Sequence, residues 1–290
     1  MLNQIKPQAA LILFFFFGAS IACAKENPSA DEILQRHLDS IGPASIRAAA
    51  KSRVVEGTAS YRVLVGGTGR IDGKAVVVSE GRKLHMLLKI NAQYTGEQFI
   101  CDGDKTSVAG TYPDKSRSEF GEFLRGEDVP LREGLLGGEL STAWPLLDLA
   151  SRKGKLRYQG LKKVDGADLY AVTYQPKKST DLEITLLFEP QTFHHVGTIY
   201  VVSVHAGLGM SDSGDRASET ESARQNQTRY RIEEKFGDFR TADGLTLPNH
   251  YDLRFQQELQ NGFTKQVEWE VNVTRVLNNI SVDARNFQIH

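Results

Sequence analysis

The last third of the chain alternates apolar and polar residues with a period of two. Between Leu245 and Phe255 the odd positions are mostly large and apolar, while most even positions are polar or charged. The same alternation resumes between Phe263 and Thr274, after the pair Asn261-Gly262. A period of two indicates a strand with one dry face, and Asn-Gly favours a tight hairpin because both residues tolerate positive φ. With the preceding run that begins near Tyr230, the pattern predicts three long antiparallel strands whose apolar face carries Tyr251, Phe255, Phe263 and Trp269.

Shorter runs rich in β-branched residues occupy most of the remaining chain. Five lie at residues 54–65, 69–79, 83–90, 94–101 and 105–109, and three or four more lie within 155–164, 169–175, 181–188 and 194–204. No helix of crossover length intervenes within either group, so neighbouring strands are expected to be antiparallel. About ten or eleven strands are too many for a strongly twisted sheet to stay flat. The chain is therefore predicted to be mainly β (α+β), with the sheet curled into a half-open barrel.

An N-terminal helix and a middle helix are expected on the concave side of this sheet. Ser29 and Glu32 have the spacing of a capping box, and apolar residues then recur at helical spacing from Ile33 to Ile41. A short second helix over 46–50 follows this N-terminal helix. In the middle of the chain, Ser141 or Thr142 can cap a helix that carries Trp144 and Leu147. The half-barrel is predicted to wrap over the N-terminal and middle helices, whose apolar sides need a dry partner.

Two stretches lack the periodicity of a strand. Residues 112–138 mix charged residues, glycines and short apolar groups, which predicts a loop with helical turns. Residues 206–228 are rich in Ser, Gly, Asp, Glu, Arg and Gln, which predicts a long, exposed, polar loop. Loops of this length are often functional, so a role in contacting a partner is one interpretation.

The first 24 residues have the composition of an export signal. Lys6 is the only charged residue, residues 9–17 are almost wholly apolar, and Ala22-Cys23-Ala24 supplies small residues at the cleavage position. The apolar stretch is shorter than the ~20 residues that a membrane span needs. We expect a signal peptide over 1–24, followed by a single periplasmic domain over 25–290.

The two cysteines leave one alternative open. Cleavage after residue 24 leaves Cys101 without a partner, so no disulfide framework follows. Cys23, however, ends a sequence that loosely matches a lipobox, and its lipidation would make the protein a membrane-anchored lipoprotein. Cys101 closes an apolar strand, where a buried and inert thiol is expected.

Charge and motifs argue against several classes of function. The net charge of -1 provides no basic field for a phosphate backbone, so we expect no nucleic-acid partner. His194 and His195 are adjacent in a strand and point to opposite faces, and no other spacing suits metal ligands. No nucleophile elbow is present. We predict no catalytic residue, no metal and no cofactor, and hence a protein that is not an enzyme.

The large apolar residues allow two interpretations. They form an ordinary core, as large apolar residues usually do. Alternatively, the curled sheet carries more apolar surface than its helices cover, and the surplus lines a ligand cavity. The residues predicted to line that cavity are Leu88, Tyr94, Phe99, Trp144, Leu147, Tyr251, Leu253, Phe255 and Trp269.

Several short motifs, in their order and spacing, resemble those of a known family. They are the opening helix with Ile41-Gly42, the segments Phe99–Lys105 and Phe188–Thr192, and the pair Phe236–Arg240 and Asp243–Pro248. Together with the export signal, they resemble the outer-membrane lipoprotein-sorting proteins of the LolA-like superfamily. The resemblance implies a half-open antiparallel barrel that wraps over helices and holds acyl chains of lipids or lipoproteins without covalent chemistry. Peripheral contact with a membrane is a separate expectation for this chain.

Three hypotheses about function follow. The first is a periplasmic carrier that binds lipid or lipoprotein acyl chains in an apolar cavity. The second is a cell-envelope protein-interaction module, in which the barrel is packed and the 206–228 loop or a sheet edge contacts a protein partner. The third, a hydrolase on the same scaffold, has no candidate nucleophile in the sequence.

Overall fold

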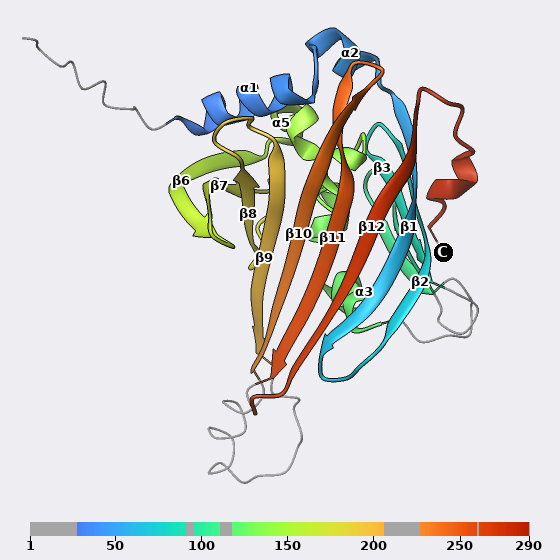
Figure 1. Ribbon diagram of the computed structural model, residues 1–290, viewed down its shortest axis with the longest axis vertical. Coiled ribbons are helices and arrows are strands. Elements are labelled where there is room, and N and C mark those ends of the chain that lie inside the picture. The colour runs from blue at the N-terminus through green and yellow to red at the C-terminus, as the bar shows by residue number, and fades with distance from the viewer. Residues whose placement is uncertain (1–27, 91–95, 111–117, 206–226, 260, 290) are drawn as a thin grey trace, which may run out of the picture.

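The computed structural model describes residues 28–90, 96–110, 118–205, 227–259 and 261–289 (Figure 1). The predicted signal peptide, Cys23, Tyr94 and nearly all of the 206–228 loop lie outside the described residues. The predictions made for them therefore stay predictions. Within the described part, no helix has the length and apolar character needed to cross a membrane.

The described strands form one antiparallel sheet of twelve strands, which curls as predicted (Figure 1). The predicted count of ten or eleven was too low, although the class is confirmed. The strands are β1 Ser52–Val65, β2 Arg70–Glu80, β3 Lys83–Lys89, β4 Glu97–Cys101, β5 Thr106–Gly110, β6 Lys155–Val164, β7 Ala167–Gln175, β8 Glu183–Phe188, β9 His195–His205, β10 Gln227–Ala242, β11 Leu245–Leu259 and β12 Thr264–Asn278.

The first and last strands meet in the middle of the sheet. The strand order is β5-β4-β3-β2-β1-β12-β11-β10-β9-β8-β7-β6, so β1 pairs with both β2 and β12. Strands β5 and β6 are consequently the two edges. Edge strand β6 exposes four cations, which discourage pairing with another chain: Lys155, Arg157, Lys162 and Lys163.

The described helices are short, apart from the first. They are α1 Ala30–Ile41, α2 Ala44–Ala49, α3 Glu119–Gly126, α4 Val129–Arg132 and α5 Leu149–Arg152, with 3-10 turns η1 Gly138–Leu140, η2 Pro145–Leu147 and η3 Ala284–Phe287. The cap of α1 is as predicted, since the amide of Glu32 donates to the hydroxyl of Ser29 at 3.1 Å. Helices α3 and α4 supply the helical turns expected within 112–138.

The predicted middle helix is wrong. In its place the chain forms η1, η2 and α5, which are separated by non-helical residues. Trp144 precedes Pro145 and adopts φ -50° and ψ 118°, outside the helical region. The proline ring clashes with a helical conformation of the residue before it, and proline has no amide hydrogen to continue a helix. Pro145 therefore starts a new turn instead of occupying the first turn of a helix begun at Ser141 or Thr142.

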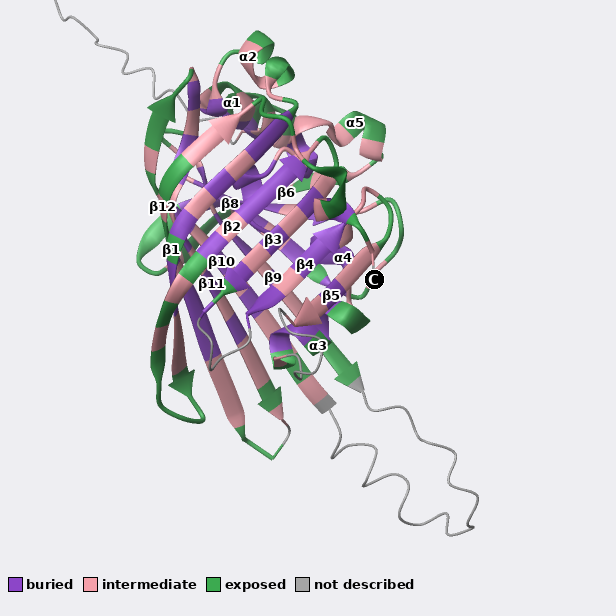
Figure 2. Cartoon of the chain, turned by 90° about the vertical axis from the view of Figure 1, so that its right-hand side faces the viewer, coloured by how far each residue is buried: buried purple, intermediate pink, exposed green. Residues whose placement is uncertain are grey.

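The concave side of the sheet is the core. Buried positions alternate with less buried ones along the strands, as Figure 2 shows for β1 to β5. In β11 the predicted odd positions Tyr251, Leu253 and Phe255 are buried, together with Trp269 of β12. Phe263 is 50% exposed because it lies in the turn before β12, so its predicted place on the apolar face is wrong. Cys101 is a buried free thiol whose pKa is raised by burial, as expected for an inert cysteine.

Candidate functional site

The residues predicted to line a cavity gather on the concave side. Of the nine, Tyr94 lies outside the described residues, Leu147 is partly buried, and the other seven are buried in one core cluster: Leu88, Phe99, Trp144, Tyr251, Leu253, Phe255 and Trp269. The void beside Leu88 and Tyr251 has a volume of only about 10 Å³. That is at the lower limit for a single water molecule. In this conformation the interior is packed with side chains of the protein itself.

Helix α3 lies on the concave side of the sheet (Figure 1), where its side chains pack among the predicted lining residues. Its Phe120 is fully buried, and the ring centroid lies 5.3 Å from Phe99, 5.5 Å from Phe255 and 5.3 Å from Trp269. Three of the predicted lining residues are thus covered by one side chain of this helix. Phe123, one turn further on, packs against Tyr230 and Phe255.

The N-terminus of α3 is held by a buried carboxylate from strand β4. Glu97 accepts hydrogen bonds from the amide and the hydroxyl of Ser118, at 3.0 and 2.7 Å. The same Ser118 hydroxyl caps α3 by accepting from the amide of Gly121 at 3.1 Å. Burial raises the pKa of Glu97, although the hydrogen bonds from Ser118 favour its charged form. Lys265 of β12 adds an ion pair to Glu119 in the first turn of α3. Two side chains from the sheet therefore fix this end of the helix.

A groove opens beside this held end of α3. It has a volume of about 350 Å³ and lies between α3 and strands β1, β3 and β12. The apolar side chains that line it are Tyr61, Val63, Leu88, Ile90 and Trp269. Glu97, Glu119 and Lys265 supply its charged groups. Leu88 and Trp269, both predicted lining residues, thus border this groove as well as the packed core.

A second segment, residues 134–144, also fills the concave side and is called the plug here. Its Gly137 donates its amide hydrogen to Glu234 of β10 at 2.7 Å. Glu234 also accepts from the hydroxyls of Tyr200 and Tyr251, at 2.6 and 2.8 Å. Burial raises the pKa of Glu234, although all three hydrogen bonds favour its charged form. One buried carboxyl group therefore joins the plug to strands β9, β10 and β11.

Glu139 ties the plug to β9 and β1. Its side chain lies 3.2 Å from Nδ1 of His195, whose Nε2 lies 2.9 Å from the hydroxyl of Thr198. Its backbone carbonyl accepts from the guanidinium of Arg53. Burial alone would raise the pKa of Glu139, but the hydrogen bond and charge of His195, with a contribution from His37, hold it below its usual range.

His37 joins the plug to α1. Its Nε2 accepts from the indole N–H of Trp144 at 3.2 Å, so the proton of the neutral ring is on Nδ1, which donates to the carbonyl of Phe193 at 3.1 Å. Burial lowers the pKa of His37 to about 4. Trp144, a predicted lining residue, also stacks on His195 with ring centroids 4.6 Å apart. These bonds hold the plug in a single position.

Sequence reasoning missed the polar groups of the plug. Glu234 shares the inward face of β10 with the buried residues Ile232 and Phe236, and this alternation was visible in the sequence. A carboxylate at an inward position signals a buried polar partner. Glu139 lies in a glycine-rich stretch without periodicity, where no such signal exists. His195 is buried and His194 is partly exposed, but His194 precedes β9, so only one of the two histidines lies in the predicted strand. Among the described residues, no group of three or more His, Cys, Asp or Glu side chains could hold a metal ion.

Comparisons with known proteins give structural likenesses only. No family model matches the sequence, and no curated protein matches it. The chain is similar to a DUF1329 family protein from Desulfovibrio piger, with 12% identity, 90% of this chain and 98% of that chain covered, and a TM-score of 0.49. It is also similar to an outer membrane lipoprotein-sorting protein domain from Vibrio parahaemolyticus, with 9% identity, coverage of 89% and 97%, and a TM-score of 0.40.

A third similar structure is a chain of the Pseudomonas aeruginosa MucA/MucB complex, with 10% identity, coverage of 86% and 99%, and a TM-score of 0.22. A lipoprotein-sorting domain is therefore among the structures similar to this chain, as the sequence resemblance led us to expect. At identities of 9 to 12% and TM-scores below 0.5, these likenesses carry no conclusion about ligand, partner or activity.

Proposed function

We propose that this chain is an exported cell-envelope carrier that holds an acyl chain of a lipid or lipoprotein without covalent chemistry. The observation that carries the proposal is the groove beside α3, whose apolar wall runs directly into the aromatic core. Its volume of about 350 Å³ lies within the ~300–1,000 Å³ that small-molecule sites usually have. The resemblance of the sequence motifs to lipoprotein-sorting proteins agrees with this role.

Loading requires α3 to move. An acyl chain that enters between Leu88 and Trp269 meets Phe120, which occupies the space in front of Phe99 and Phe255. Each methylene buried contributes ~0.8 kcal/mol, so several are needed to offset the contacts that α3 loses. In the loaded state Phe99 and Phe255 line the cavity in place of contacting the helix. The deeper residues Trp144, Leu147, Tyr251 and Leu253 complete the lining only if the plug moves as well.

Lys265 supplies the polar anchor in this proposal. In the closed conformation its ammonium group pairs with Glu119 at the mouth of the groove. When α3 leaves, that ammonium group becomes available to the carboxylate or phosphate at the head of the ligand. Affinity for a fatty acid is therefore expected to exceed affinity for the uncharged alcohol of the same chain length.

Native mass spectrometry of protein purified from the cell envelope tests the proposal. We expect a mass excess that corresponds to an acyl lipid, and saturable uptake of a fluorescent fatty acid after its removal. Lys265→Gln is expected to weaken fatty-acid uptake while leaving uptake of the alcohol unchanged. Lys74→Gln, at an exposed lysine of β2 outside the groove, is the matched control. Protein that carries no lipid and takes up no fatty acid would refute the carrier function.

The second candidate is a protein-interaction module with a packed barrel. It is favoured by the packed interior and by an apolar cluster on the outer face, formed by Leu169, Ala171 and Leu187 with Val164, Val196 and Ile199 around them. A groove of about 520 Å³ runs along this cluster, and its charged residues include the ion pairs Arg231–Glu233 and Lys235–Asp165. Three results together would favour this candidate. A crosslinker at position 199 would trap one specific envelope protein, Ile199→Asp would lose that complex, and the wild type would take up no acyl chain.

A further inference from the structure

The outer face of strands β6, β7 and β8 is hollowed beside the sheet edge. The hollow has a volume of about 660 Å³ and continues under the loop 176–182. The pairing of β6 with β7 shifts register between Tyr158 and Leu161, and Gly160 between them has φ +92°. A bulge of this kind bends a strand and redirects its side chains. Residues on both sides of the shift, Gln159 and Lys162, line the hollow.

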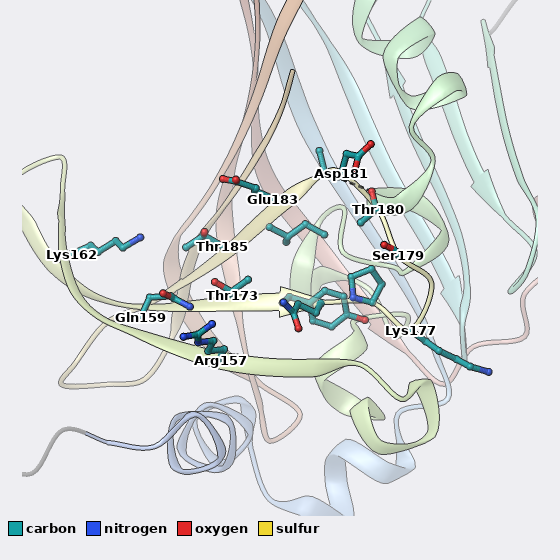
Figure 3. A pocket seen from close by; sticks show the side chains of 15 residues that line it. Arg157, Gln159, Lys162, Thr173, Lys177, Ser179, Thr180, Asp181, Glu183 and Thr185 are labelled. Atoms are coloured by element: carbon teal, nitrogen blue, oxygen red, sulfur yellow. Dashed lines mark hydrogen bonds between the residues drawn. The ribbon is translucent and has the colours of Figure 1, made fainter. Parts of the chain in front are cut away.

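The side chains that face the hollow are polar. Arg157, Thr173 and Thr185 are successive cross-strand partners, so they form one row on the outer face. Figure 3 shows Arg157 and Gln159 together below Thr173, with Glu183 above, and Lys162 reaching toward Thr185 from the side. The apolar residues of the hollow, among them Leu182 and Ile184, are buried in the core behind it. A hydrophilic ligand therefore fits this hollow better than an acyl chain.

The charged groups of the hollow have no partners within the described part of the chain. No ion pair or side-chain hydrogen bond is made there by any of the five charged residues that line the hollow: Arg157, Lys162, Lys177, Asp181 and Glu183. Several arginines elsewhere on the same outer face are paired, as Arg62 and Arg254 are with Glu268. Three unpaired cations line this concave surface against two carboxylates, and Figure 3 shows that Lys177 extends away from the other two cations, Arg157 and Lys162. Arg157 and Lys162 therefore favour an anionic group, and a planar guanidinium matches phosphate geometry. Glu183 and the amide and hydroxyl side chains can bond ligand hydroxyl groups.

We propose that this hollow binds a phosphorylated sugar, either free or as the headgroup of a lipid. Arg157 and Lys162 hold the phosphate, while Gln159, Thr173, Thr185 and Glu183 hydrogen-bond the ring hydroxyls. Phosphate alone leaves most of the 660 Å³ unused. This site lies on the opposite face of the sheet from the groove beside α3, and it does not depend on acyl binding.

Titration of the isotopically labelled protein with glucose 6-phosphate, glucose and inorganic phosphate tests the proposal by NMR. We expect saturable binding of the sugar phosphate, with shifts confined to β6–β8 and the loop 176–182. Its affinity should be at least about tenfold higher than that of glucose or phosphate alone, as expected for charge-assisted and hydroxyl hydrogen bonds acting together. Equal affinity for all three, or no saturable binding, would overturn the proposal.

Two neighbouring lysines provide a matched pair of variants. Lys162 lines the hollow, whereas Lys163 is exposed on the same strand but borders the separate groove along Leu169. Lys162→Gln should weaken binding of glucose 6-phosphate by about tenfold, and Lys163→Gln should leave it unchanged. The same effect in both variants would contradict a specific site. Sedimentation with phosphatidylcholine vesicles that contain phosphatidylinositol phosphate shows whether the ligand is a lipid headgroup or a free sugar phosphate. Cosedimentation that depends on Lys162 indicates a lipid headgroup. Binding of glucose 6-phosphate without cosedimentation indicates a free sugar phosphate.

Discussion

Acidification should destabilise the protein through His37. In the folded protein the Nε2 of this ring accepts the indole hydrogen of Trp144, so a second proton on the ring would face an N–H group. Burial lowers the pKa of His37 from its ordinary value of 6.5 to about 4. Between these two values the unfolded chain binds a proton that the folded protein does not bind. Stability is therefore greatest above pH 6.5 and falls as the pH falls toward 4.

The magnitude follows from the two pKa values. Their difference is 6.5 − 4 = 2.5, and each pH unit corresponds to ~1.36 kcal/mol. His37 alone should thus cost about 3 kcal/mol of unfolding free energy on acidification. That is a large part of the ~5–15 kcal/mol by which domains are usually stable. The pKa of Glu139 is lowered and that of Glu234 is raised, so these two carboxyl groups contribute to the pH dependence with opposite signs.

Comparison with His37→Gln isolates the effect of the histidine. A glutamine amide can accept from Trp144 and donate to the carbonyl of Phe193, but it does not titrate. The free energy of unfolding should be measured in urea at a series of pH values between 7 and 4. Its slope against pH should be larger for the wild type than for the variant, by the amount that corresponds to uptake of about one proton on unfolding. Parallel profiles for the two proteins would refute the reasoning.

Three further predictions concern contacts that hold the sheet and its filling together. Phe120→Ala should lower the free energy of unfolding by ~3–5 kcal/mol and increase fatty-acid uptake, because it removes the side chain in front of Phe99 and Phe255. Reduced uptake by the folded variant would contradict the role of α3. Glu268→Ala should lower the free energy of unfolding in urea by ~1–2 kcal/mol, since Arg62 and Arg254 lose the carboxylate they bond at 2.5 and 2.8 Å. Glu270→Ala should lower it less, and equal effects of the two substitutions would contradict this ranking. Tyr251→Phe should cost ~1 kcal/mol by removing one hydrogen bond to Glu234, and no measurable change would show that this bond does not stabilise the plug.

The sequence allowed the strands and the curl of the sheet to be predicted, because these depend on local patterns. The alternation in β11 placed Tyr251, Leu253 and Phe255 on one face, and Asn261-Gly262 marked the turn before β12. The pairing of β1 with β12 was not predicted. Their register, for example Tyr61 opposite Trp269, joins residues about two hundred positions apart, and no local periodicity encodes such a pairing.

The filling of the concave side was the harder part to predict. Phe120 lies in a stretch of weak periodicity, so the sequence did not show that α3 would cover Phe99, Phe255 and Trp269. The chain from Gly134 to Trp144 is held by buried polar groups of α1, β1, β2, β9 and β10. Such long-range hydrogen bonds leave no trace in a hydrophobic pattern. Apolar positions alone therefore predicted a lining without predicting what packs against it.

Entry of an acyl chain into the groove beside α3 can be tested with the two tryptophans of the chain. Trp269 lines the groove, whereas Trp144 lies in the plug and contacts His37 and His195. A brominated fatty acid should quench the fluorescence of Trp144→Phe, which retains Trp269, in a saturable manner and leave that of Trp269→Phe largely unchanged. Absence of quenching in Trp144→Phe, or equal quenching in both variants, would contradict entry through this groove.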